Sequence, residues 1–138
     1  MKHLESVRQK AAIKMGFGDI SQSISPKICI VSPPKNGGTI HSCYFTPFDC
    51  HTAHAVSGVL CLAAACLIKS TVANNVAQLP IPKDKKFEQN VAIEHASGKT
   101  MTSITADKST HEIHFLAASS IRTARPLFEG PAIVSNAN

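Results

Sequence analysis

The segment 53–68, with the sequence AHAVSGVLCLAAACLI, constrains the fold more than any other part of the chain. Drawn as a helix, it is apolar on nearly every face, and it contains no proline. A helix that is hydrophobic all round has to be buried all round. It is shorter than the ~20 apolar residues that span a bilayer, so other parts of the chain must cover it. The sequence therefore predicts a sheet that curls around one buried central helix at 53–68.

Short strands are expected on both sides of this helix. The turn signal Asn36-Gly37-Gly38 separates two β-prone runs, and the turn 96–99 separates two more. Strands are predicted at residues 27–31, 39–46, 90–95, 100–105, 111–116, 121–127 and 131–134.

An N-terminal surface helix is predicted within residues 1–18. Apolar residues recur there at helical spacing and glycines follow them: Leu4, Val7, Ala11, Met15, Gly16 and Gly18. The predicted fold class is α+β, with a mostly antiparallel sheet curled around the buried central helix within 27–134, plus this helix. Residues 1–138 are predicted to form one domain, since 138 residues with 43% hydrophobic content supply a single core.

The net charge of +5 is spread along the chain. The densest cluster, Lys83, Lys85 and Lys86, lies in a proline-rich stretch and is predicted to be a solvated loop. Nucleic-acid-binding proteins usually carry a basic stripe or aromatic side chains that stack on bases. The sequence shows neither pattern, so no nucleic-acid partner is predicted. An excess of basic over acidic residues also suits a small anionic substrate such as a di- or tricarboxylate.

The five cysteines are predicted to be free thiols. Their number is odd, and residues 1–14 lack the apolar core of a secretory signal, so a reducing compartment and a cytoplasmic location are predicted. No apolar run is long enough to span a membrane, and no membrane partner is predicted. Cys29, Cys61 and Cys66 lie in apolar runs and are expected in the core.

Five short motifs, in order along the chain, resemble motifs of one protein family. They are Met15-Gly16-Phe17-Gly18-Asp19; Ser32-Pro33-Pro34; Phe45-Thr46-Pro47 with His51, Ala53, Ser57 and Gly58; Ile93-Glu94-His95-Ala96-Ser97-Gly98; and Arg122-Thr123-Ala124-Arg125 with Leu127, Glu129 and Gly130. On these motifs the chain resembles the PrpF family of carboxylate isomerases, which includes methylaconitate and methylitaconate isomerases. The position of Ala96 is proline in the family's motif.

The resemblance implies a fold similar to that of diaminopimelate epimerase. Family members have two similar domains, each a sheet curled around a central helix, and an active site in the cleft between them. This chain resembles the C-terminal half. The Lys and the Cys credited with proton transfer lie in the family's N-terminal half, so the catalytic residues stay unknown for this chain.

The function implied by the resemblance is that of the C-terminal domain of an isomerase that needs no cofactor. The substrate would be an unsaturated di- or tricarboxylate of the methylaconitate, aconitate or methylitaconate type, and proton transfer would give cis–trans or double-bond isomerisation. The implied partners are this carboxylate and the N-terminal half, in cis or in trans, or a second copy in a homodimer. The alternative is a non-catalytic remnant, or a module that binds carboxylates or self-associates.

The predicted substrate site lies at the start of the central helix. The first backbone N–H groups of a helix have no intrahelical partner and carry partial positive charge, which suits a carboxylate. The predicted substrate-binding residues are Thr46, His51, Thr52, His54, Ser57 and Gly58. Glycine at position 58 would allow close approach to the backbone. In the structural alternative, Thr52 or Ser57 only caps the helix and Gly58 is a packing notch.

His51 and His54 are three residues apart, a spacing that would place them near each other on one face of a helix. An imidazole can hydrogen-bond a carboxylate or exchange a proton near neutral pH. Together with His41, Cys43 and Cys50 they form a His/Cys-rich stretch, but its spacing matches no standard zinc pattern, so no metal is predicted. The alternative for each histidine is an ordinary structural role.

Cys50 is the predicted candidate for a reactive thiol. It stands beside His51 and just before the helix, and both a helix N-terminus and a protonated imidazole lower the pKa of a thiol. The alternative is a small buried residue without reactivity.

Arg122 and Arg125 are expected on opposite faces of a strand. One of them could bind a carboxylate in bidentate fashion, while the other would pair with Glu129 or Glu94. Structural roles for both arginines are favoured, because strand alternation separates them.

Overall fold

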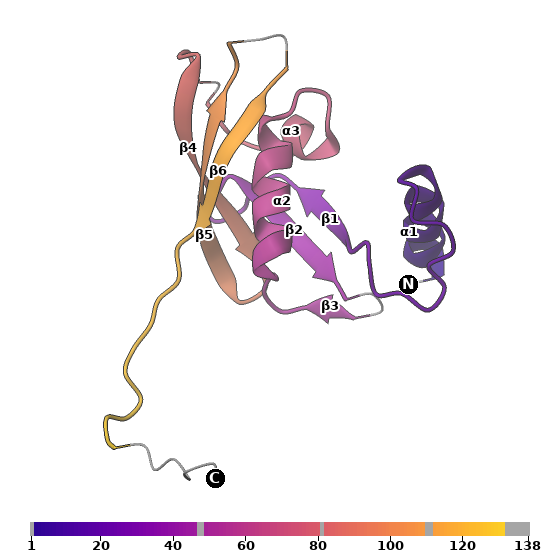
Figure 1. The fold of residues 1–138 in the computed structure, drawn as a ribbon, viewed down its shortest axis with the longest axis horizontal. Helices are drawn as coiled ribbons and strands as arrows, with labels where there is room; N and C mark the ends of the chain where they lie inside the picture. Colours follow the sequence, from indigo (N-terminus) through magenta and orange to yellow (C-terminus); the bar gives the residue numbers. More distant parts are fainter. Residues whose placement is uncertain (1, 47–48, 81, 110–111, 132–138) are drawn as a thin grey trace, which may run out of the picture.

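The computed structural model describes residues 2–46, 49–80, 82–109 and 112–131. In these ranges the chain forms a six-stranded sheet with one long helix, α2, against one face (Figure 1). The helices and strands are α1 (Lys2–Lys14), β1 (Ile28–Ser32), β2 (Ile40–Phe45), β3 (Cys50–His51), α2 (Val56–Leu67), α3 (Val72–Val76), β4 (Lys86–His95), β5 (Gly98–Asp107) and β6 (His114–Ser120).

The sheet has the strand order β1-β2-β4-β5-β6, and β3 pairs with β2 beside this path. All pairings are antiparallel except that of β2 with β4, where Ile40 lies opposite Ile93. Parallel neighbours need a crossover connection, and the chain between β2 and β4 supplies it through α2. The predicted α+β fold class, with a mostly antiparallel sheet and a helix against it, is confirmed.

The core lies between α2 and the sheet. The side chains that α2 buries recur at helical spacing, which explains why the segment folds as a helix on this surface. They are Val59, Leu62, Ala63 and Cys66. The fully or almost fully buried strand residues in the same cluster are Ile40, Val91, Ile93, Ile104 and Ala106. Cys66 is fully buried, so the core placement predicted for this cysteine is confirmed, and burial raises the pKa of its thiol to about 11.

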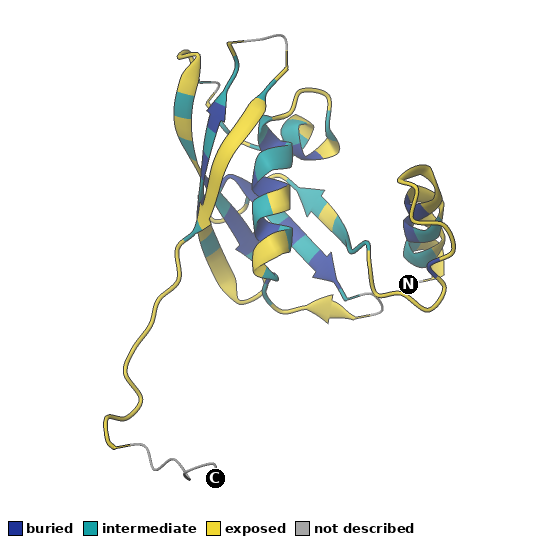
Figure 2. Cartoon of the chain, in the orientation of Figure 1, coloured by how far each residue is buried: buried dark blue, intermediate teal, exposed yellow. Residues whose placement is uncertain are grey.

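The expectation that the central helix is buried on every face is wrong. The helix begins at Val56 rather than at residue 53, and Val56, Ser57 and Cys61 are exposed. The sheet covers one side of α2, and among the described residues nothing covers the other side (Figure 2). Cys61 therefore lies outside the core, contrary to prediction, while Cys29 is half-buried against it.

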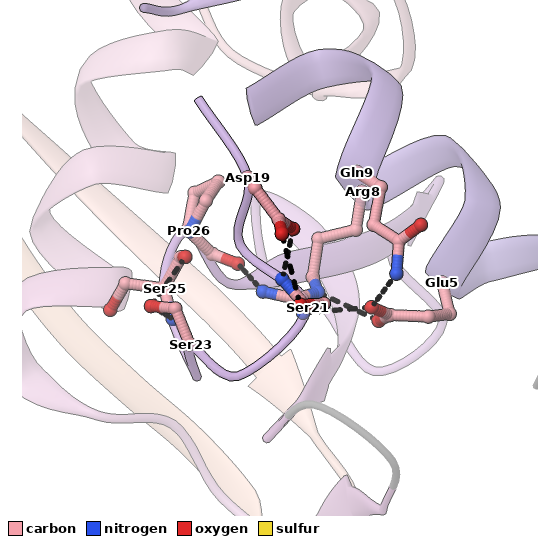
Figure 3. Close-up of polar contacts among 8 residues, drawn as sticks. All are labelled: Glu5, Arg8, Gln9, Asp19, Ser21, Ser23, Ser25 and Pro26. Atoms are coloured by element: carbon pink, nitrogen blue, oxygen red, sulfur yellow. Dashed lines mark hydrogen bonds and ion pairs between the residues drawn. The ribbon is translucent and has the colours of Figure 1, made fainter. Parts of the chain in front are cut away.

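The N-terminal helix is present as α1, but a different face is buried. Val7, Ala11 and Met15 are exposed, whereas Arg8 and Ala12 are buried. The reason is that α1 packs on its own following loop rather than on the sheet, from which it stands apart (Figure 1). Arg8 pairs with Glu5 at 2.7 Å and donates to the carbonyl of Pro26 at 3.2 Å, which ties helix and loop together (Figure 3).

The strand predicted at 121–127 is absent. Residues 121–131 form no regular element, are exposed throughout, and run away from the sheet (Figure 2). A β-strand needs a neighbouring strand for its hydrogen bonds. In the described chain, Ile121 N–H still donates to the carbonyl of Met101 on β5 at 3.0 Å, but no strand lies beside the residues that follow it. Arg122 and Arg125 are therefore not on opposite faces of a strand. Most of the last predicted strand, 132–134, and His111 lie outside the described residues.

The loop between β1 and β2 is fixed by a buried carboxylate. Glu94, only 1% exposed, accepts hydrogen bonds from the backbone N–H groups of Lys35, Asn36 and Gly38 at 2.7–2.8 Å. The predicted turn at 36–38 is thus held by a residue of β4. The suggested pairing of Glu94 with an arginine is wrong, because these N–H groups already occupy its carboxylate.

The lysine-rich stretch behaves largely as predicted. Lys83 and Lys85 are exposed and outside regular structure. Lys86 is also exposed, but it begins β4 and lies 3.8 Å from the carboxylate of Asp107 on β5. An exposed pair of this kind contributes little to stability.

Candidate functional site

The N-terminus of α2 is not capped by a side chain. The N-cap residue is Ala55, whose methyl group cannot accept a hydrogen bond, and the first intrahelical bond runs from Val59 N–H to its carbonyl at 2.9 Å. The N–H groups of Val56, Ser57 and Gly58 are therefore left without an intrahelical acceptor. Capping by Thr52 or Ser57 is wrong, since neither occupies the cap position. The helix presents free donors and the positive end of its dipole here.

The segment that leads into α2 is anchored to the turn between β4 and β5. Its carbonyl at Thr52 accepts two hydrogen bonds from Ser97, one from the backbone N–H at 2.9 Å and one from Oγ at 2.8 Å. The turn that supplies Ser97 is the predicted hairpin at 96–99, with His95 opposite Gly98. Gly98 has φ +129°, a conformation that favours glycine. The approach to the helix is thus held by residues far away in sequence.

His51 is exposed on β3, next to the start of the helix. Its Nδ1 accepts a hydrogen bond from the backbone N–H of Ala53 at 3.0 Å. In the neutral ring the proton is then on Nε2, which makes Nε2–H a donor. His51 therefore adds an imidazole donor to the backbone donors of α2.

His54 is buried, with 4% of its surface exposed. Its Nε2 lies 2.9 Å from Ser42 Oγ, and its ring lies against that of Tyr44 at a centroid distance of 4.4 Å. Its Nδ1 is buried without a hydrogen-bond partner in the described part of the chain. Such an orphaned polar atom is uncommon and marks a place where a ligand or water can bind.

The burial of His54 keeps it neutral. Desolvation, followed by the influence of His95 and His51, lowers its pKa from 6.5 to about 4. His54 therefore acts as an uncharged hydrogen-bonding group at neutral pH and not as a carboxylate-pairing cation. The expected common face of His51 and His54 is also wrong, because both residues precede the helix.

This burial gives a pH-dependent stability. A histidine with a depressed folded pKa stabilises the fold fully above its unfolded pKa, so the free energy of unfolding should fall as the pH drops from 6.5 to about 4. His54→Phe, which keeps an aromatic ring beside Tyr44, should remove this part of the pH dependence in urea unfolding series. Substituting the exposed His3 by Gln is the control. An unchanged profile in His54→Phe would contradict the assignment.

Gly58 allows a close approach, but to a side chain of the protein itself. A Cβ placed on Gly58 would lie 2.7 Å from Cε2 and 3.2 Å from Oη of Tyr44. The packing-notch alternative for this residue is therefore the one that the structure supports. The Tyr44 ring is buried and lies between Gly58 and His54, so it has little room to move.

Gly58→Ala should destabilise the protein by about 1–3 kcal/mol through overpacking against Tyr44. An alanine normally stabilises a helix by about 1 kcal/mol relative to glycine, so the sign of the effect is diagnostic. Urea unfolding of Gly58→Ala beside Ser57→Ala, an exposed neighbour on α2, measures it. A more stable Gly58→Ala would show that the notch is not required.

Thr46 and Cys50 do not join the other predicted residues as expected. Thr46 follows β2, and it donates its N–H to the carbonyl of Asp49, just before β3, at 2.9 Å. Cys50 is exposed on β3, and partial desolvation, with a further effect of Cys43, raises the pKa of its thiol. The predicted lowering of this pKa by the helix and His51 is wrong.

His95 belongs to the same region although sequence reasoning gave it no role. Its Nε2 lies 3.0 Å from Thr100 Oγ1, and its Nδ1 is buried without a partner among the described residues. It is close enough to His54 to lower the pKa of that residue. The available signal was its place at the end of a strand, directly before the turn that anchors Thr52.

The described residues contain no cluster of three or more His, Cys, Asp or Glu side chains that could hold a metal ion. A hollow of about 200 Å³ lies at the other end of α2, lined by Cys66, Leu67, Asn74 and Pro80 among others. No helix within the described ranges has the length and apolar character needed to cross a membrane.

Comparison with known proteins gives relatives over nearly the whole chain. The profile of the PrpF protein family matches residues 1–135. A 4-oxalomesaconate tautomerase of Pseudomonas putida is 35% identical over 127 residues, which cover 92% of this chain and 33% of that protein. A (4E)-oxalomesaconate Delta-isomerase of a Novosphingobium strain is 30% identical over 131 residues, which cover 95% of this chain and 35% of that protein. The chain spans about a third of the length of these relatives.

Proposed function

This chain belongs to the PrpF family, and on that premise we propose that it is part of an isomerase of unsaturated di- or tricarboxylates. The two relatives described above are named a tautomerase and a Delta-isomerase, and both names denote reactions that move a proton and a double bond. The chain covers about a third of each, so the complete activity is proposed to require further polypeptide. The resemblance assigns to that polypeptide the Lys and the Cys that transfer protons.

The part of the reaction proposed for this chain is to hold a substrate carboxylate. The observation that carries this role is the uncapped start of α2, which follows closely after His54, a buried residue whose Nδ1 has no hydrogen-bond partner among the described residues. When a base removes a proton beside a carboxylate, negative charge spreads onto the carboxylate oxygens. Fixed N–H donors at that place stabilise this charge more strongly as it develops.

The donors divide into backbone and side-chain groups. The backbone donors are the N–H groups of Val56, Ser57 and Gly58 at the start of the helix. The side-chain donor is Nε2–H of His51. The neutral His54 would hydrogen-bond a polar group of the substrate without adding charge. The net charge of +5 adds a general attraction for an anion.

The substrate is proposed to be a compound of the methylaconitate, aconitate or methylitaconate type, as the resemblance implies, or of the oxalomesaconate type named in the relatives. All are unsaturated and carry at least two carboxylates. We place the activity in the cytoplasm, a location that suits five free thiols.

Val56→Pro tests the carboxylate role directly. Position 56 is the first helical residue, where proline is tolerated, and the extended Ala55 has the conformation required before proline. The substitution removes one N–H donor from the site and leaves the helix intact. Calorimetric titration with trans-aconitate should show binding by the unaltered chain and about tenfold weaker binding by Val56→Pro, equivalent to ~1.4 kcal/mol.

Val72→Pro is the matched control. Val72 is the first residue of α3, its preceding residue Thr71 is also extended, and α3 lies at the other end of α2. This variant should bind trans-aconitate like the unaltered chain. Equal weakening by both variants would mean that the effect is structural. Absence of any binding would favour the alternative of a non-catalytic module.

A further inference from the structure

Helix α1 leaves its own apolar side exposed. Apolar residues at helical spacing lie along one side of a helix, and such a side normally packs against an apolar surface. On α1 this side runs from Leu4, which is half-buried, through Val7 and Ala11, which are exposed, to Met15 just after the helix. Val7 is 42% exposed and Met15 is 60% exposed. These four residues form the α1 face, which the described part of the chain leaves largely uncovered.

The opposite side of α1 is fixed by buried polar contacts. Arg8 donates to the carboxylate of Glu5 at 2.7 and 2.8 Å and to the carbonyl of Pro26 at 3.2 Å (Figure 3). Gln9 donates to the same carboxylate at 2.9 Å, and Ala12 is fully buried on this side. Turning the helix so that the α1 face points inward would break these contacts and leave a buried charge without its partner, which is costly. The α1 face is therefore held outward.

Two lysines border the α1 face. Lys10 follows Val7 by three positions and Lys14 follows Ala11 by three, so each lies beside the face on the helix surface. Both lysines are exposed, and neither forms an ion pair with a described residue. The surface that covers the α1 face is therefore expected to be an apolar groove with carboxylates along one rim.

The family relatives contain a polypeptide that can supply this groove. The PrpF profile matches from residue 1, so it includes α1. The tautomerase and the Delta-isomerase match 92% and 95% of this chain, but the matched residues are only 33% and 35% of those proteins. In each relative the remaining polypeptide is linked to the matched segment, so a contact between them is intramolecular. Linkage gives an effective concentration of roughly millimolar, which favours this polypeptide over a second copy.

We propose that the α1 face docks into an apolar groove of the further polypeptide that completes the isomerase. An amphipathic helix laid in a groove is anchored by residues at positions i, i+3 and i+7, the spacing of Leu4, Val7 and Ala11. Lys10 and Lys14 pair with carboxylates at the rim. This docking rests on the proposed function, which requires the further polypeptide, but it uses none of the residues assigned to the carboxylate.

A joined protein tests the docking. In it, this chain replaces the matched third of the Pseudomonas putida tautomerase, whose remaining part then supplies the groove. Val7→Glu places a charge on the α1 face and should lower the melting temperature of the joined protein by roughly 5 °C or more, because the charge would be buried without a partner. The same substitution should leave the melting temperature of the isolated chain unchanged, because Val7 is exposed there.

Ile13→Glu is the matched control. Ile13 is a β-branched apolar residue of the same helix, 65% exposed, and it lies two positions from Ala11 and from Met15, so it is not on the α1 face. This substitution introduces the same charge and should leave both melting temperatures unchanged. An equal loss in the two joined variants, or no loss in joined Val7→Glu, would overturn the proposal.

Coexpression of the two parts as separate polypeptides keeps the test valid if the joined protein does not fold. The parts should elute together in size-exclusion chromatography, and Val7→Glu, unlike Ile13→Glu, should weaken their association at least about tenfold. Parts that stay separate would overturn the proposal. A dimer of the isolated chain that only Val7→Glu disrupts would also overturn it, because a second copy would then be the occupant.

Titration of the isolated chain with trans-aconitate separates this proposal from the carboxylate role. Val7→Glu should bind trans-aconitate like the unaltered chain. Absence of binding by the unaltered chain would contradict the carboxylate role, while the melting temperatures of the joined variants would still decide the docking.

Discussion

Replacing Glu94 with alanine is expected to release the loop between β1 and β2 and to cause a large loss of stability. The substitution leaves three backbone N–H groups, those of Lys35, Asn36 and Gly38, without the carboxylate that now accepts them. Unsatisfied donors and a lost buried side chain both act against the fold. We expect the melting temperature to fall by roughly 10 °C or more.

The same carboxylate predicts a loss of stability in acid. The N–H of Lys35, followed by those of Gly38 and Asn36, holds the pKa of Glu94 below its usual 4.5. A depressed carboxyl pKa stabilises the fold at pH values above 4.5, and this contribution disappears as the pH falls through the lower, folded value. Glu94→Gln should lose this acid dependence while keeping one acceptor oxygen, so its stability near neutral pH should lie between those of Glu94→Ala and the unaltered chain.

Thermal melting between pH 3 and pH 7 would separate these effects. Glu129→Gln removes a negative charge from the exposed terminal segment and serves as the control. A Glu94→Ala variant with the same melting temperature as the unaltered chain would show that the loop does not depend on the carboxylate.

Ile93→Ala is expected to have the second large effect. Ile93 is fully buried on β4, lies opposite Ile40 of β2, and belongs to the cluster beneath α2. Truncation there removes apolar contacts from both the parallel strand pair and the helix. The free energy of unfolding should fall by about 2–5 kcal/mol.

Urea unfolding at one fixed protein concentration measures this loss, because self-association would make stability depend on concentration. Met101→Ala is the control, since Met101 is exposed on β5 and pairs with Ala92, the neighbour of Ile93. A loss below about 1 kcal/mol in Ile93→Ala would mean that the core relaxes around the gap.

The elements that could be predicted from the sequence are those fixed by local pattern. The apolar segment gave α2, and the turn signals near Gly37 and Ser97 gave the two hairpins. Their register then follows from which strand face is buried, as Ile93 and Val91 show by pointing into the core. The family resemblance, carried by short motifs, is also matched over residues 1–135.

The features that escaped prediction depend on contacts between distant residues. Glu94 binds the loop at Lys35, which precedes α2 in the sequence, whereas Glu94 follows α2. No local sequence pattern predicts this contact. Arg8 is buried because it pairs with Glu5 and Pro26, which reverses the expected face of α1. The segment 121–127 has the composition of a strand, but composition does not supply a neighbour for it.

The candidate site stays a prediction, and the structure changes its details. The helix begins at Val56 rather than at residue 53, and His51 lies on β3 before it. His54 is buried and neutral rather than exposed to a substrate carboxylate. It packs against Tyr44 and Ser42 of β2, a strand that the sequence pattern does not connect to it. Thr46 was predicted from a motif, and in the structure its backbone N–H bonds to the carbonyl of Asp49.

The carboxylate that holds the first hairpin loop also has a consequence for the order of folding. Glu94 is 59 residues from Lys35 along the chain, and closing so long a segment carries a substantial entropic cost. On a ribosome, β1 and β2 emerge long before their anchor has been synthesised. Their loop can take its final form only once β4 has docked beside them, so the first hairpin cannot be completed as an independent early unit.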